Sequence, residues 1–66
     1  MIATIREGND ANLYSEPNTD SIIVYRIPAG SRVEVDLRKD LGKFCIVCTP
    51  MGVEGFCMRK HIKVEQ

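Results

Sequence analysis

The stretch SIIVYRIPAGSRVEVDL, residues 21–37, decides the fold of this chain. In its second half Val33, Val35 and Leu37 alternate with charged residues, which is the period-two pattern of a strand with one buried face. Its middle, Pro28-Ala29-Gly30, is a turn, because proline presets one φ and glycine permits a positive one. The stretch therefore predicts two short strands joined by a turn.

The first half, residues 21–27, is the most apolar part of the chain. Alternation places Ile23, Tyr25 and Ile27 on the inward face and leaves Ile22 and Val24 projecting outward. Exposed aliphatic side chains that lie together tend to mark an interface, and an open edge strand assists pairing. We therefore expect a candidate partner or dimer surface, formed by Ile22, Val24 and Ile46.

In the rest of the chain, short apolar runs likewise alternate with turn residues, and helix signals are almost absent. We expect further strands at residues 2–5, 11–14, 44–48, 53–58 and 62–64, a charged hairpin loop at 38–43 and one 3₁₀ turn at 59–61. The sequence predicts a single all-β domain over residues 1–66, a small, partly open barrel of five to seven short antiparallel strands.

Composition narrows the range of partners. The 66 residues include nine basic and nine acidic side chains, so the formal net charge is zero. Nucleic acid and anionic membranes are therefore not expected as partners. No apolar run reaches the ~20 residues of a membrane span, and residues 1–7 lack a secretory pattern. The odd count of three cysteines favours a reducing compartment, so we expect a cytoplasmic protein, or an extracellular one if the chain is a module of an exported protein.

Five motifs in order resemble a known family. They are ANLYSEP at residues 11–17, the turn ending in Gly30 followed by Val33 and Val35, FCIV at 44–47, GFC at 55–57, and HI at 61–62. Together they resemble the bacterial SH3 domain, or SH3b, family over nearly the whole chain. The resemblance implies an SH3-like barrel that binds peptides in a groove, and family members mostly target exported enzymes to peptidoglycan.

The departures from the family pattern lie around that groove. Phenylalanines stand where the family tends to have tryptophans, at positions 44 and 56, so aromatic stacking is kept while the indole N–H donor is lost. Tyr14 replaces the usual arginine and Glu16 the usual glycine. The resemblance implies that five residues near the groove bind the ligand, and we call them the ligand-binding set: Tyr14, Glu16, Phe44, Phe56 and Met58.

We therefore expect a non-enzymatic module that binds a protein or peptide, with no catalytic residues and no cofactor. Such a module could serve as an intracellular adaptor or inhibitor, including one carried by a phage or mobile element. The alternative ligand is cell-wall peptide, if the chain is a targeting module of a larger exported hydrolase.

A second alternative is a zinc-stabilised domain with a Cys3His ligand set: Cys45, Cys48, Cys57 and His61. Residues 45 and 48 differ by an odd number of positions, so on a regular strand their side chains point to opposite faces. Both reach one ion only if the backbone bends near Cys48. We prefer the interpretation that Cys45 and Cys57 are small core residues.

Overall fold

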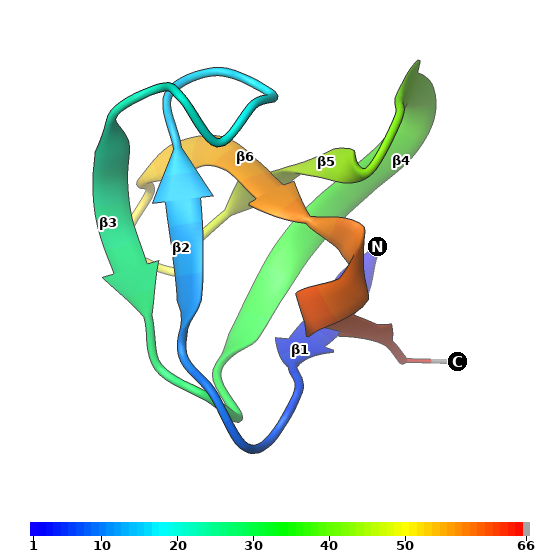
Figure 1. Ribbon diagram of the computed structural model, residues 1–66. Coiled ribbons are helices and arrows are strands. Elements are labelled where there is room, and N and C mark those ends of the chain that lie inside the picture. Colours follow the sequence, from blue (N-terminus) through cyan, green and yellow to red (C-terminus); the bar gives the residue numbers. More distant parts are fainter. Residues whose placement is uncertain (66) are drawn as a thin grey trace.

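The computed structural model describes residues 1–65 and forms an all-β, partly open barrel (Figure 1). Its strands are β1 (Ile2–Ile5), β2 (Ala11–Tyr14), β3 (Ile23–Ile27), β4 (Arg32–Leu41), β5 (Phe44–Cys48), β6 (Glu54–Met58) and β7 (Ile62–Val64). A single 3₁₀ turn, η1 (Arg59–His61), precedes β7. The predicted fold class, strand number and 3₁₀ turn are confirmed.

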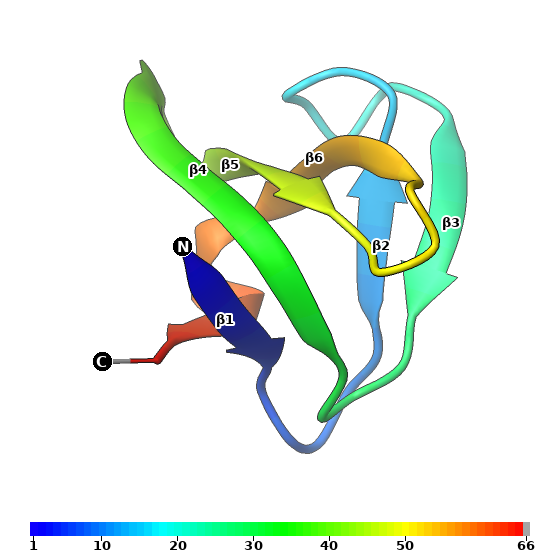
Figure 2. The ribbon, with the colours of Figure 1, turned by 180° about the vertical axis from the view of Figure 1, so that it is seen from behind.

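The strands form one sheet in the order β3-β2-β6-β5-β4-β1-β7, and every strand pair is antiparallel. The sheet curls round so that β4, the longest strand, crosses the molecule beside both β1 and β5 (Figure 2). The barrel does not close, because β3 and β7 stand at the two ends of the strand order and do not pair with each other. The fold therefore has two free sheet edges of different length, five residues in β3 and three in β7.

One side of the curled sheet forms the core, and we call it the inner face. Fully or almost fully buried side chains from β1 to β7 meet there: Ala3, Ile5, Ala11, Leu13, Ile27, Val33, Val35, Cys45, Val47, Cys57 and Ile62. Val33 and Val35 are buried as their alternation predicts, and Leu37 packs against the cluster while partly exposed. Within residues 1–65, no helix is long and apolar enough to cross a membrane.

The largest error in the predicted boundaries lies at one hairpin, while β3 and β6 begin two residues and one residue later than expected. Residues 38–43 are not a six-residue loop, because β4 continues to Leu41, which lies opposite Phe44. Only Gly42 and Lys43 connect the strands, and Gly42 has φ +66, as a two-residue hairpin with glycine at its first position requires. The charges at 38–40 mark a solvated strand end, not a loop, because a strand that projects beyond the core can carry charge on both faces.

Candidate functional site

A row of side chains crosses the face opposite the core, which we call the outer face. Residues directly opposite each other in antiparallel strands project to the same side of the sheet. Tyr14 of β2 lies opposite Phe56 of β6, and Phe56 lies opposite Ile46 of β5. On the other side of β2, Tyr14 lies opposite Ile23 of β3. These four residues, the outer row, come from four neighbouring strands.

Ile23 joins this row because of an irregularity in β3 that the sequence does not reveal. The register between β2 and β3 shifts at Tyr14, so that Leu13 faces Tyr25 while Tyr14 faces Ile23. Ile23 and Tyr25 therefore lie on opposite faces, and the prediction that Ile23, Tyr25 and Ile27 share the inward face is wrong. Only Ile27 is buried, and Ile23 is 50% exposed.

The aromatic residues of the predicted site come together, but with unequal exposure. The rings of Tyr14 and Phe44 meet edge to face, with centroids 5.9 Å apart and an interplanar angle of 81°. Phe44 is only 7% exposed, and the Arg59 Nε donates a hydrogen bond of 3.0 Å to its carbonyl oxygen. Phe44, two residues before Ile46 in β5, therefore lies on the outer face but is covered, while Tyr14 and Phe56 are half-buried and present part of their surface.

The other two predicted ligand-binding residues lie at the ends of this aromatic group. Met58 is half-buried opposite Phe44, on the β6 side. Glu16 is exposed in the loop after β2, where its backbone N–H and carbonyl both contact the Ser21 hydroxyl, at 3.3 and 3.2 Å. The structure thus places Tyr14, Phe44, Phe56 and Met58 on one face and Glu16 in the loop that follows β2.

A groove of about 560 Å³ hollows the outer face next to Ile46. Its lining comes from the chain start and from β4, β5 and β6: Met1, Glu34, Val35, Asp36, Leu37, Arg38, Ile46, Cys48 and Glu54. Glu34, Cys48 and Glu54 form a second cross-strand row, parallel to the outer row. The outer row therefore runs from the edge strand β3 to the rim of an open groove.

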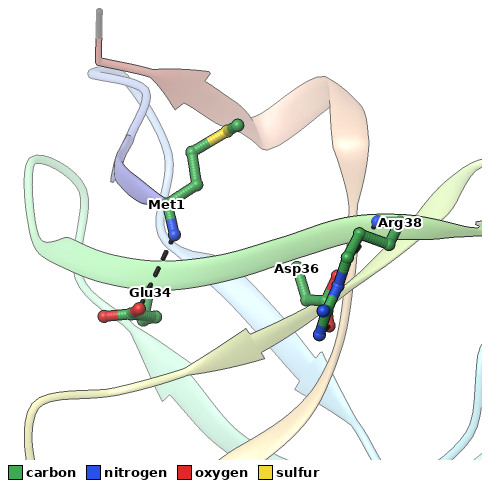
Figure 3. A network of polar contacts seen from close by, with 4 residues as sticks. All are labelled: Met1, Glu34, Asp36 and Arg38. Atoms are coloured by element: carbon green, nitrogen blue, oxygen red, sulfur yellow. Dashed lines mark hydrogen bonds and ion pairs between the residues drawn. The ribbon is translucent and has the colours of Figure 1, made fainter.

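Two ion pairs hold charges on the β4 side of this groove (Figure 3). The Met1 ammonium lies 3.6 Å from a Glu34 carboxylate oxygen. The Arg38 guanidinium contacts both Asp36 oxygens, with the Nη2 2.8 Å from Oδ2 and the Nε 3.0 Å from Oδ1. The hydrogen bonds from Arg38, from its side chain first and then its backbone N–H, hold the pKa of Asp36 well below its usual range. Asp36 is therefore a carboxylate at any ordinary pH.

The residues of the zinc alternative are not brought together. Cys45 and Cys57 face each other on the inner face, fully buried, whereas Cys48 lies on the outer face with its thiol 3.6 Å from the Thr49 carbonyl oxygen. Burial raises the pKa of Cys45, and it raises the pKa of Cys57 to about 12, with the neighbouring Cys45 adding to the effect. Across residues 1–65, no three His, Cys, Asp or Glu side chains lie close enough to share a metal ion.

The predicted partner surface is divided between two places. Ile22 and Val24 are 74% and 45% exposed at the β3 edge. Ile46 lies in β5, separated from β3 by β2 and β6, and belongs to the outer row instead. Sequence reasoning paired them because all three project away from the core, but outward direction alone does not place residues side by side.

Comparison with known proteins does not assign this chain to a family. No protein-family model matches the chain, and no curated protein matches it either. A function for this chain is therefore inferred from the residues that the fold brings to the outer face.

Proposed function

We propose that this chain is a non-enzymatic binding module that holds an extended segment of a partner protein across its outer row. One observation carries the proposal: the fold gathers Ile23, Tyr14, Phe56 and Ile46 from four strands into a continuous, partly exposed apolar row. Aromatic and aliphatic side chains that remain partly exposed in a shallow site bind peptides by shape and stacking.

The dimensions of the row fit a short peptide. Neighbouring strands lie about 4.8 Å apart, so the three intervals from β3 to β5 span about 14 Å. An extended chain rises about 3.3 Å per residue, so four or five peptide residues cover this distance. The groove beyond Ile46 then receives the next part of the ligand.

The resemblance to the SH3b family supports the same assignment. The residues that the resemblance implies for the peptide groove, Tyr14, Phe44, Phe56 and Met58, lie on the face that carries the row. We therefore propose an SH3b-like adaptor or inhibitor whose binding face carries phenylalanines in place of tryptophans. Its three free cysteines favour a reducing compartment such as the cytoplasm.

The proposal is tested with peptides selected against the folded protein from a random display library. A selected peptide is synthesised and titrated into ¹⁵N-labelled protein, and shift changes are mapped onto the structure. We expect the largest changes at Tyr14, Phe56 and Ile46. We also expect Phe56→Ala to weaken binding about tenfold or more, because buried aromatic anchors carry most of the binding energy in such sites.

Because Phe56 is half-buried, Ile46→Ser serves as a second variant that leaves the inner face intact. Met51→Ser is the matched control, since Met51 is 86% exposed in the turn between β5 and β6. If folded Phe56→Ala and Ile46→Ser proteins bind as tightly as the Met51→Ser control, the outer row is not the binding site. A parallel pelleting assay with purified peptidoglycan decides whether the ligand is cell-wall peptide.

A further inference from the structure

The groove beside Ile46 adjoins a second hollow of about 380 Å³. The lining of this second hollow is mostly apolar and comes from β1, β4 and the segment at the end of β5: Ile2, Arg32, Val33, Glu34, Cys48, Thr49 and Pro50. Glu34 and Cys48 line both hollows, so the two meet at these side chains. A ligand that enters the groove beside Ile46 therefore has an open path over Cys48.

The side chains where the hollows meet share one cross-strand register. Glu34 and Glu54 each lie opposite Cys48, one on either side of β5, and we call these three residues the junction. Ile2 continues the row beyond Glu34. Directly opposite residues project to the same face, so the two glutamates stand about 10 Å apart at the backbone with one small thiol side chain between them. The junction is therefore wide enough for a long side chain to lie between two carboxylates.

The carboxylates of the junction are accessible to a ligand. Glu54 is exposed and has no ion-pair partner among residues 1–65. The Glu34 side chain is 66% exposed, although its carboxylate lies 3.6 Å from the Met1 ammonium (Figure 3). Straight on from the outer row lies Asp36, whose carboxylate already holds the Arg38 guanidinium. Opposite charge therefore directs a cationic ligand residue to the junction and not to the end of the outer row.

We propose that the partner segment turns at Ile46, places a lysine or arginine at the junction and sets an apolar side chain in the second hollow. This path rests on the proposed function and adds the class of peptide that the outer row holds. Ile46 and Cys48 are two residues apart on β5, about 7 Å, so about two ligand residues make this step. From the β3 side, the ligand is therefore an apolar stretch, a basic residue and a further apolar residue, about eight residues in all.

The reactivity of the Cys48 thiol measures whether the ligand crosses the junction. Cys45 and Cys57 are fully buried, so the reaction of native protein with Ellman's reagent reports Cys48. A peptide selected by display and present at saturation should slow this reaction about tenfold or more, because the reagent needs an accessible thiol. Equal rates with and without a bound peptide that Phe56→Ala weakens would leave the outer row as the site and overturn the path over Cys48.

Charge reversal at the junction tests for the basic ligand residue. In ~0.15 M salt, which screens distant charges, Glu54→Lys should weaken the selected peptide about fivefold, as expected for an exposed ion pair. The matched control is Glu7→Lys, at an exposed glutamate in the turn between β1 and β2, and it should leave binding unchanged. A peptide whose own basic residue is replaced by glutamate should prefer the Glu54→Lys protein to the wild type. Equal affinity of the Glu54→Lys and Glu7→Lys proteins for the selected peptide overturns the assignment of a basic residue.

Truncation tests the second hollow. Ile2 lines it and is 38% exposed, so Ile2→Ser should weaken the full peptide about threefold or more by removing apolar contact area. The same variant should bind a peptide that ends at its basic residue as tightly as the wild type does. An Ile2→Ser protein that binds both peptides like the wild type shows that no ligand residue fills the hollow. If Phe56→Ala weakens no selected peptide, the proposed function itself fails, and this path fails with it.

Discussion

Gly55 is where the β2–β3 hairpin meets the rest of the barrel, and replacing it with alanine tests how closely these parts fit. A Cβ built at Gly55 lies 2.7 Å from the Tyr14 carbonyl oxygen and 2.9 Å from the Leu13 Cγ. The first contact is with backbone, so a side-chain rotation cannot relieve it. β2 and β6 share only one registered pair, Tyr14 with Phe56, directly beside this point. We therefore expect Gly55→Ala to push β2 away from β6.

The expected cost is about 3 kcal/mol of unfolding free energy. Overpacking a buried site costs about 1 to 3 kcal/mol, and a backbone clash belongs at the upper end. Displacing β2 also loosens the Tyr14–Phe44 contact, worth about 0.5 to 1.5 kcal/mol. Alanine recovers about 0.4 to 1 kcal/mol by restricting the unfolded chain. A 66-residue domain has roughly 3 to 10 kcal/mol in total, so the variant should be marginally folded.

Urea denaturation followed by circular dichroism measures this cost, with Gly42→Ala as the control. At Gly42 nothing lies within 4 Å of an added Cβ, but φ is +66. Its alanine variant should therefore lose only about 1 kcal/mol, from backbone conformation alone. The close approach of β2 to β6 is refuted if Gly55→Ala proves no more destabilising than Gly42→Ala.

Three further predictions concern ionisable groups. In native protein a thiol reagent such as Ellman's should modify Cys48 first, because Cys45 and Cys57 are fully buried; equally fast reaction of all three before urea is added would contradict this. Because the pKa of Cys57 is raised from 9.0 to about 12, the folded state keeps a proton that the unfolded state releases. Unfolding free energy should therefore fall by up to about 1.4 kcal/mol per pH unit between these values, and Cys57→Ala should flatten that slope in urea titrations at successive pH values. The pKa of Asp36 is lowered, so its contribution to stability is present above about pH 4 and is lost as the pH falls below it. Carbon-detected NMR should find the Asp36 carboxyl titrating below the ordinary aspartate range, and a normal midpoint would show that the Arg38 pair does not persist in solution.

Local pattern was enough to predict most strands. β1, β2, β5, η1 and β7 have the predicted bounds, because short alternating runs between turn residues leave few other ways to satisfy the backbone. The alternation of Val33 and Val35 against charged neighbours likewise predicted the buried face of β4 correctly. Whether the ligand-binding set acts as proposed stays a prediction, although its four strand residues lie on one face.

Sequence could not predict what depends on register between distant strands. The shift beside Tyr14 arises where β2 must pair with both β3 and β6, and it reversed the expected direction of Ile23. No pattern in residues 21–27 predicts that shift, which becomes visible only when β3 is paired with β2.

By itself, then, the sequence determined the all-β class, most of the turn positions and the residues available for the core, because period-two alternation and turn chemistry are local properties. Only the tertiary structure decided that Ile23, Tyr14, Phe56 and Ile46 form one row and that Ile22 to Tyr25 stand exposed along an unpaired edge. The physical reason is that side-chain neighbours in a sheet are set by hydrogen-bonded register across strands, which residues far apart in the sequence fix together.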